Sequence, residues 1–180
     1  MTELSDAAIV RAVLNGEADA FKELVHRYQD QLYRHAERMT GQPDVAADII
    51  QAAFVKAFRS LARCRNPERV GAWLFRIASN QCKDHLKSRR RKNLRLDDTR
   101  RLPAEEGDPE EAAERAQVRD RIRIALDRLT AEQREAFVLK HLAGLSYPEI
   151  AARLNESISA LKMRVHRARE ELQTLLEEYR

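Results

Sequence analysis

The chain has 180 residues, with 33 Lys and Arg against 29 Asp and Glu, and only five glycines. No two glycines lie closer than 25 positions, whereas a phosphate-binding loop, a dinucleotide fingerprint or a nucleophile elbow needs two or more within about six positions. The commonest nucleotide-binding and hydrolase motifs are therefore excluded. A formal net charge of +4 is only a weak indication of a polyanionic partner.

The sequence also indicates the cellular compartment in which the protein is found. Two cysteines, Cys64 and Cys82, make a disulfide scaffold untenable and favour a reducing cytosol. No apolar run approaches the roughly 18 residues of a membrane span, and the acidic N-terminus does not resemble a signal peptide. We therefore expect a cytoplasmic protein that is not inserted in a membrane.

Apolar residues at helical spacing predict four helices in the first half, at about 5–14, 21–39, 44–61 and 68–87. The second helix is expected to stop at the Thr-Gly-Gln-Pro sequence that follows it. Asp44 is then a plausible N-cap of the third. No stretch alternates long enough to predict a strand.

A change in charge separates the two halves. Segment 88–101 holds seven basic and two acidic side chains, and segment 102–114 holds six acids and no base. Such a switch is typical of a basic patch followed by a flexible acidic linker. The expected fold is all-α, with two small helical domains at 1–95 and 117–180 joined by a linker at 96–116.

The second half predicts a helix up to Leu129 and then two capping boxes, Thr130 to Gln133 and Ser146 to Glu149. The first opens a helix at about 131–142 that Gly144 ends, and the second opens a short helix to residue 154. A tight turn at 155–157 precedes a long helix to about 178. This layout is typical of a helix-turn-helix, although capping boxes alone also fit an ordinary helical hairpin.

Three helix faces carry candidate contacts. On the last helix, small residues near the start and long donors further along favour DNA reading over a merely solvated face. These residues are Ser159, Ala160, Lys162, Met163, Arg164, His166 and Arg167.

On the helix predicted at 68–87, polar and basic residues fall within a ~60° wedge with an aromatic ring at its edge. They are Arg69, Arg76, Asn80, Lys83 and Lys87, with Trp73 beside them. Such a stripe can hold a phosphate backbone while the ring stacks on bases. Taken alone, the pattern fits a core tryptophan and a solvated stripe slightly better.

The third face lies on the helix predicted at 44–61 and has mixed charge with an apolar residue in its middle. It comprises Asp48, Gln51, Ala52, Val55 and Arg59. Such a face suits a protein partner better than DNA, although an unremarkable surface is the commoner explanation.

No catalytic or metal-binding set is apparent. Cys82 and His85 supply two ligands, which make no site without others. The histidines His26, His35 and His141 lie in amphipathic segments without a Ser or Cys constellation. We expect no metal, no cofactor and no enzymatic activity.

Four segments in this order resemble the bacterial RNA polymerase sigma factors, and the compact two-domain form resembles their extracytoplasmic-function (ECF) group. The segments are 44–54 (DVAADIIQAAF), 73–80 (WLFRIASN), 145–154 (LSYPEIAARL) and 161–169 (LKMRVHRAR). The resemblance covers about 10–95 and 117–176, which is most of the chain.

The resemblance implies a transcription initiation factor that binds core RNA polymerase and directs it to promoters. In that family the mixed-charge face binds the clamp of the largest polymerase subunit. The next helix engages the −10 element, which implicates Arg63, Trp73, Arg76, Asn80, Lys83 and Lys87. The helix-turn-helix reads the −35 element, and an anti-sigma factor is an expected partner.

The sequence departs from the family pattern in several places. Ala47 and Ala52 stand where acids are common, Asn155 replaces a turn glycine, and Met163 replaces a small polar residue. Two rival interpretations remain: a sigma mimic that titrates an anti-sigma factor, and a stand-alone helix-turn-helix regulator. The first should lack the basic DNA-facing residues, and the second leaves Trp73 and Asp48 without a role.

Overall fold

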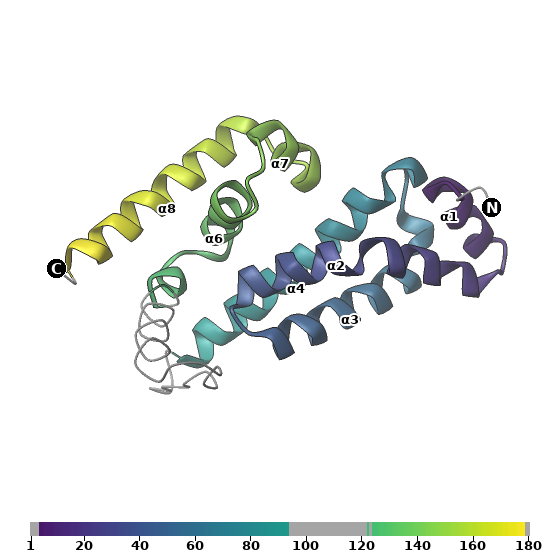
Figure 1. The fold of residues 1–180 in the computed structure, drawn as a ribbon, viewed down its shortest axis with the longest axis horizontal. Helices are drawn as coiled ribbons and strands as arrows, with labels where there is room; N and C mark the ends of the chain where they lie inside the picture. The colour runs from purple at the N-terminus through teal and green to yellow at the C-terminus, as the bar shows by residue number, and fades with distance from the viewer. Residues whose placement is uncertain (1–3, 94–121, 123, 179–180) are drawn as a thin grey trace, which may run out of the picture.

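The computed structural model describes residues 4–93, 122 and 124–178, and all regular elements among them are helical (Figure 1). The all-α prediction is confirmed. The predicted linker at 96–116 lies outside the described residues.

The first unit consists of α1 (Asp6–Leu14), α2 (Phe21–Thr40), α3 (Pro43–Arg59) and α4 (Val70–Asn93). The second contains α6 (Ala131–Phe137), a π-helical turn (Val138–Leu142), α7 (Tyr147–Leu154) and α8 (Ile158–Glu178). Two single 3₁₀ turns, Leu61–Arg63 and Pro67–Arg69, connect α3 to α4.

Helices α2, α3 and α4 pack against one another because each presents one apolar face to the others. Leu24, Leu32, Met39 and Leu74 are almost completely buried between them. Burial of each such side chain stabilises the fold by about 1.5–3 kcal/mol. These contacts fix the orientation of α3 and α4, and therefore of the polar faces that these helices turn to solvent.

A polar cluster fastens α1 to this bundle. The Tyr28 hydroxyl donates a hydrogen bond to the Asp6 carboxylate, which also accepts one from Arg27 at 2.5 Å. Burial and the bond to Asp6 raise the pKa of Tyr28 to about 12.

A methyl group at Gly71 of α4 would lie 2.6 Å from the Tyr28 ring, so only glycine allows this close approach of α4 to α2.

Two boundary predictions in the first unit were wrong. Asp44 is not the N-cap of α3, because Gln42 takes that place and Pro43 is the first helical residue. Proline suits that position, where its fixed φ is helical and its missing N–H is not needed. Helix α4 begins at Val70, after the 3₁₀ turn, and continues to Asn93 instead of ending near 87. Basic residues in its last turn stabilise the negative end of the helix dipole.

The local signals of the second unit are confirmed. Thr130 Oγ1 accepts a hydrogen bond from Gln133 N at 3.2 Å, and Gln133 Oε1 accepts one from Thr130 N at 2.8 Å. Ser146 and Glu149 form the same reciprocal pair at the start of α7. Asn155 adopts the left-handed conformation, with φ 57°, that the turn between α7 and α8 requires.

The sequence did not predict that the two units share a core. Helices α6 and α7 pack on α4, and the buried residues Val138, Ile150 and Leu161 belong to one contiguous cluster with Leu74 and Phe75. Figure 1 shows α6 and α7 beside the α2–α4 bundle, with α8 extending away from it. The two units are therefore closed on each other in this structure.

No helix in the described part of the chain combines the length and apolar character that a membrane crossing needs.

Candidate polymerase and nucleic-acid interfaces

The predicted partner face of α3 is solvent-exposed, as its helical spacing indicated. We call it the α3 face. Its residues Asp48, Gln51, Ala52, Val55 and Arg59 are all exposed, and the Val55 side chain is 46% exposed. Phe58 is also 43% exposed, although its ring packs edge-on against the Phe21 ring with 5.2 Å between the two ring centroids. Exposed apolar side chains within a mixed-charge face are typical of a protein-binding surface.

A surface hollow joins the α3 face to α4. It is lined by all five residues of the α3 face, and Arg63, Trp73 and Ile77 line its other side. Trp73 is half-buried, so it is neither a fully buried core residue nor a free surface ring. The sequence did not predict that the partner face and Trp73 border the same hollow.

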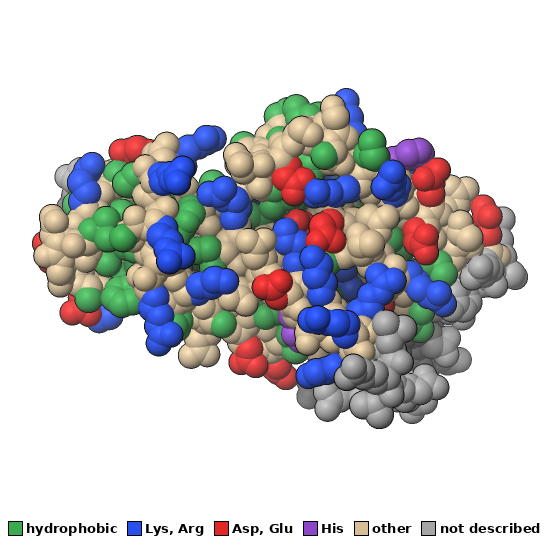
Figure 2. All heavy atoms as spheres, turned by 180° about the vertical axis from the view of Figure 1, so that it is seen from behind, with side chains coloured by type: hydrophobic (Ala, Val, Ile, Leu, Met, Phe, Trp, Pro, Cys, Tyr) green, Lys and Arg blue, Asp and Glu red, His purple; other side chains and the backbone are tan. Residues whose placement is uncertain are grey.

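A second hollow, which we call the basic hollow, lies on the other side of Trp73. Its polar lining comes from arginines and asparagines, and no carboxylate is among the described residues that line it. These residues are Arg63, Cys64, Arg65, Asn66, Arg69, Ala72, Trp73, Arg76, Ala152 and Asn155. Figure 2 shows Lys and Arg side chains gathered across the reverse side of the molecule, with some Asp and Glu among them. The arginines and the ring together can hold a phosphate and a base.

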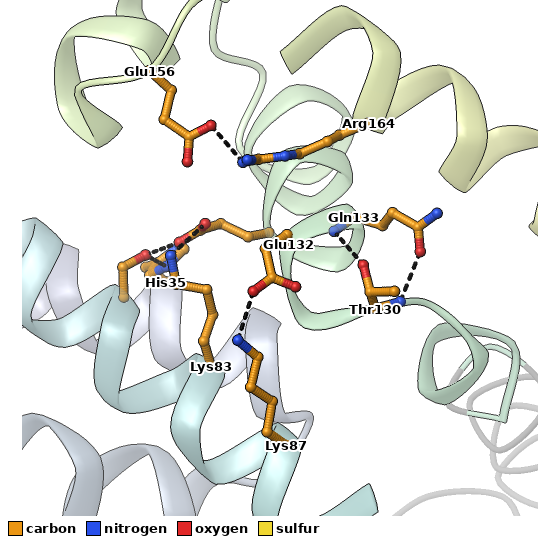
Figure 3. A network of polar contacts seen from close by, with 10 residues as sticks. His35, Lys83, Lys87, Thr130, Glu132, Gln133, Glu156 and Arg164 are labelled. Carbon is orange, nitrogen blue, oxygen red and sulfur yellow. Dashed lines mark hydrogen bonds and ion pairs between the residues drawn. The ribbon is translucent and has the colours of Figure 1, made fainter. Parts of the chain in front are cut away.

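The α4 stripe continues from this hollow toward the second unit. It consists of Arg76, Asn80, Lys83 and Lys87 of α4, together with Arg69 of the 3₁₀ turn that precedes the helix. Among the described residues, no carboxylate forms a salt bridge with Arg69 or Arg76, whereas the last two lysines of the stripe are both paired. Lys83 Nζ lies 3.0 Å from Glu135 Oε2, and Lys87 Nζ lies 2.7 Å from Glu132 Oε1 (Figure 3). Both acids belong to α6 of the second unit.

The Lys83 pair is part of a buried polar network that the sequence analysis missed. The Ser79 hydroxyl donates a hydrogen bond to Glu135 Oε1, and His35 Nε2 lies 3.1 Å from Ser79 Oγ. Because the only hydroxyl hydrogen of Ser79 points to Glu135, His35 must donate through Nε2–H. Burial, followed by the positive charge of Lys83, lowers the pKa of His35 to about 3, so this ring is neutral.

The network corrects the expectation that no Ser or Cys constellation surrounds His35. The three side chains resemble a catalytic triad in type, but His35 is 4% exposed and Ser79 and Glu135 are fully buried. A nucleophile that no substrate can reach does not catalyse, so the arrangement is a structural one. Its members lie 44 and 56 positions apart in the sequence, where no local pattern connects them.

A second polar bridge between the units passes through Asp127. This carboxylate accepts hydrogen bonds from Arg134 at 2.8 Å and from Arg89 of α4 at 3.2 Å. Arg153 of α7 adds a cation–π contact, with its guanidinium 5.5 Å from the centre of the Phe75 ring. The seam, where the two units meet, therefore combines these polar contacts with the shared apolar core.

The predicted DNA face of α8, which we call the α8 face, is largely exposed. Ser159, Lys162, Met163, His166 and Arg167 are exposed, whereas Ala160 and Arg164 are half-buried. Arg164 forms a salt bridge of 2.6 Å with Glu156, within the same unit. The contacts on this face all come from its own unit, unlike those of the last two lysines of the α4 stripe.

The cysteines and histidines offer no metal centre in the described part of the chain. No group of three or more His, Cys, Asp or Glu side chains there is placed to hold an ion. Cys82 is completely buried, and burial raises its pKa to about 12; burial also raises the pKa of Cys64. Both thiols are therefore protonated and poorly reactive at neutral pH.

Two family models match the chain. Residues 24–92 match Sigma-70 region 2, and residues 119–172 match Sigma-70 region 4. The first match covers most of α2, all of α3 and nearly all of α4, and the second covers α6, α7 and most of α8.

Curated proteins match over nearly the whole chain. The RNA polymerase sigma-H factor of Pseudomonas aeruginosa is 34% identical over 98% of this chain and 96% of its own length. The ECF RNA polymerase sigma factor SigE of Mycolicibacterium smegmatis is 34% identical over 97% of this chain and 70% of its own. The ECF RNA polymerase sigma-E factor of Escherichia coli K12 is 33% identical over 93% and 92%.

Solved structures show the same similarity. The structure of CnrH in complex with the cytosolic domain of CnrY has a TM-score of 0.62 and 30% identity, covering 97% of this chain and 99% of that one. The sigma factor RpoE of Bartonella quintana, in complex with the anti-sigma factor NepR, has a TM-score of 0.58 and 30% identity, covering 89% and 98%.

Proposed function

The chain belongs to the ECF sigma factors of RNA polymerase, and on that premise we propose that it directs core polymerase to promoters through three separate surfaces. The observation that carries this proposal is the presence, in one chain, of basic residues on α4 and α8 together with the exposed, part-apolar α3 face. A stand-alone DNA-binding protein has no use for the third surface.

The α3 face is the polymerase-docking surface in this proposal. Asp48, Gln51 and Arg59 supply charge and hydrogen bonds, and Val55 supplies apolar area that becomes buried on docking. The family resemblance implies acids at the positions of Ala47 and Ala52, so affinity here depends more on the remaining charges. Docking beside Trp73 would bring the polymerase next to the melted DNA strand.

The −10 surface, as we define it, consists of Arg63, Trp73, Arg76, Asn80, Lys83 and Lys87. Unstacking a base costs a few kcal/mol, and stacking on an aromatic ring returns about 1–3 kcal/mol per base. The Arg63 and Arg76 guanidiniums can hold the phosphates on either side. Strand separation at the −10 element therefore requires no chemistry from this chain, and we assign it no enzymatic activity.

The α8 face reads the −35 element in the major groove. Ser159 and Ala160 allow close approach of the helix, while Lys162, His166 and Arg167 can reach base edges or phosphates. Met163 is 53% exposed and offers an apolar contact to a thymine methyl group. Arg164 is held by Glu156 and contributes as a flanking charge.

We assign the −10 and docking surfaces to a domain at 1–95, the −35 surface to a domain at 117–180, and the intervening 96–116 to the linker. The protein works in the cytoplasm, where the polymerase is. The RpoE structure contains an anti-sigma factor and the CnrH structure contains CnrY, so we also infer a protein antagonist of this kind for the present chain.

Run-off transcription tests the proposal. The purified chain is added to core polymerase on fragments covering a whole genome of the source organism, and the transcript ends are sequenced; core alone is the control. We expect initiation at a small set of positions with shared −35 and −10 sequences. No initiation on any fragment would contradict the proposal. Sequence-specific DNA binding without polymerase binding would instead support a stand-alone regulator.

A further inference from the structure

We propose that a hollow between α4 and the start of the second unit binds a small organic phosphate, of the chemical class of the nucleoside diphosphates. We call it the anion hollow. Its lining comes from the C-terminal half of α4 and from residues between 124 and 134. Of the surfaces proposed above, only Lys87 of the −10 surface takes part in it. The ligand would therefore be additional to the polymerase, the promoter and the protein antagonist.

The size and the walls of the anion hollow suit a small molecule. Its volume is about 770 Å³, within the range of roughly 300–1,000 Å³ that small-molecule sites occupy. Leu86, Leu126 and Leu129 line it with apolar surface. Small-molecule sites combine such apolar walls with a few polar groups that fix the orientation of the ligand. A ligand with a planar or apolar part beside its charged groups therefore fits better than a bare ion.

The charged side chains of the lining are mainly basic. Five cations and two carboxylates line the hollow, which leaves an excess of three positive charges among the described residues: Lys87, Arg89, Arg90, Arg128 and Arg134 against Asp127 and Glu132. The planar fork of a guanidinium matches two oxygens of a phosphate group. An excess of three charges suits a ligand that carries two phosphate groups.

The two carboxylates do not neutralise the cations around them. Glu132 pairs with Lys87 at 2.7 Å. The Asp127 carboxylate is shared, because it accepts hydrogen bonds from Arg134 at 2.8 Å and from Arg89 at 3.2 Å. One carboxylate balances only one of two guanidiniums, so positive charge remains at this point of the lining.

Two further arginines are available to a ligand. Arg90 and Arg128 are both exposed, and neither forms a salt bridge with a carboxylate in the part of the chain that the structure describes. Because both line the hollow, they can turn toward a phosphate group without breaking an existing ion pair.

Arg134 is the buried cation of the lining and the strongest sign of a missing anion. Its side chain is 2% exposed, and its Nε–H donates no hydrogen bond to any described residue. Buried donors without a partner are rare in native proteins. Burial, which Asp127 offsets only in part, lowers the pKa of this guanidinium. An anion in the hollow would stabilise the charge of Arg134.

These features favour a small ligand over a nucleic-acid strand. A strand is held by exposed cations along a groove, with aromatic rings for its bases. The anion hollow instead combines a buried guanidinium with aliphatic walls, and no aromatic ring is among the described residues that line it. We therefore assign it to an organic phosphate that enters the hollow as a whole.

The test uses the full-length protein in phosphate-free buffer, without polymerase or promoter. Isothermal titration calorimetry measures binding of ADP, pyrophosphate and adenosine. In parallel, ¹H–¹⁵N spectra follow the Nε–Hε signals of the arginines, with the Arg134 signal assigned by through-bond correlation. A 12-nucleotide single strand is the nucleic-acid probe in the same spectra.

The variant that removes ligand contacts is Arg90→Gln with Arg128→Gln. Both positions are exposed, so folding should be unaffected, and circular dichroism checks this. The matched control is Arg11→Gln with Arg34→Gln, which removes the same charge at exposed positions outside the hollow.

We expect ADP to bind at one site and to shift the Arg134 Nε–Hε signal. Pyrophosphate should bind more weakly than ADP, and adenosine should not bind. The Arg90 and Arg128 double variant should bind ADP at least about tenfold more weakly, whereas the control should bind it like the wild type.

Four results would overturn the proposal. They are no binding of ADP at millimolar concentration, equal weakening in the control, equal affinities for ADP and pyrophosphate, and a shift of Arg134 by the single strand as large as that by ADP. The last result would assign the hollow to nucleic acid. Because the test needs neither polymerase nor promoter, its failure is distinct from failure of the proposed function.

Discussion

The two DNA-facing surfaces of this protein contain similar side chains in different situations. The α8 face turns Lys162, His166 and Arg167 to solvent at the outer side of the second unit. The α4 stripe places Lys83 and Lys87 against carboxylates of α6. Two basic stripes that look alike in a sequence therefore differ in whether any of their charges are paired with the other unit. The tertiary contact, and not the charge pattern, distinguishes them.

The largest expected difference between the surfaces concerns stability. Lys83→Met leaves Glu135 fully buried without its cation, and breaking such a pair costs about 3 kcal/mol of unfolding free energy. Arg167→Met is the matched change on the α8 face and should stay within about 0.5 kcal/mol of the wild type. Urea unfolding followed by circular dichroism measures both. Equal stabilities would mean that the Lys83 pair does not form in solution.

The next prediction concerns DNA affinity. Arg167→Ala removes an exposed donor from the α8 face and should weaken binding of the −35 duplex by about 1–3 kcal/mol. Binding to core polymerase should persist, because Arg167 belongs to α8, which extends away from the bundle that contains α3 (Figure 1). Fluorescence anisotropy and a polymerase pull-down measure the two effects, with Gln173→Ala further along α8 as control. Equal loss of both would show that the residue acts on folding.

A third surface separates docking from DNA reading. Asp48→Arg reverses a charge on the exposed α3 face and should reduce core-polymerase binding about tenfold, because a like charge on the partner is repelled. Both DNA affinities of the free protein should remain unchanged. A quantitative pull-down measures polymerase binding. The control is Asp30→Arg, which reverses the charge of an exposed residue on α2. Unchanged polymerase binding would remove α3 from the docking surface.

The smallest effect is a pH dependence located at the seam. The pKa of His35 is about 3 in the folded protein and about 6.5 when unfolded. Between these values the unfolded chain binds one more proton, so stability falls as pH decreases, by about 1 kcal/mol per unit. His35→Gln should remove this contribution to the slope between pH 6.5 and 5, whereas His26→Gln, an exposed change on the same helix, should not. If the His35→Gln variant shows the same slope of unfolding free energy against pH as the wild type, His35 lies in a more hydrated site than this structure shows.

Local signals in the sequence predicted local structure well. Both capping boxes, the left-handed Asn155 and the exposed position of Val55 follow from residues within one or two helical turns of each other. The prediction of Asp44 as the N-cap of α3 was wrong because it ignored the strong preference of proline, here Pro43, for the first helical position.

The seam could not be predicted in the same way. Helical periodicity identifies which face of α6 is buried but not which surface covers it. Glu135 meets Ser79 across 56 positions of sequence, with the predicted linker between them. A glutamate at a buried helical position was the one available signal, because such a charge requires a partner from elsewhere in the fold. The α4 stripe itself was predicted, but its contact with α6 was not.

Amine reactivity measures the contrast between the two surfaces most directly. The free protein is acetylated under limiting reagent, and the modification of each lysine is quantified by mass spectrometry. We predict that Lys162, which is exposed, reacts readily, whereas Lys83, which is paired with Glu135, is protected. Equal reactivity of Lys83 and Lys162 in the free protein would contradict the account.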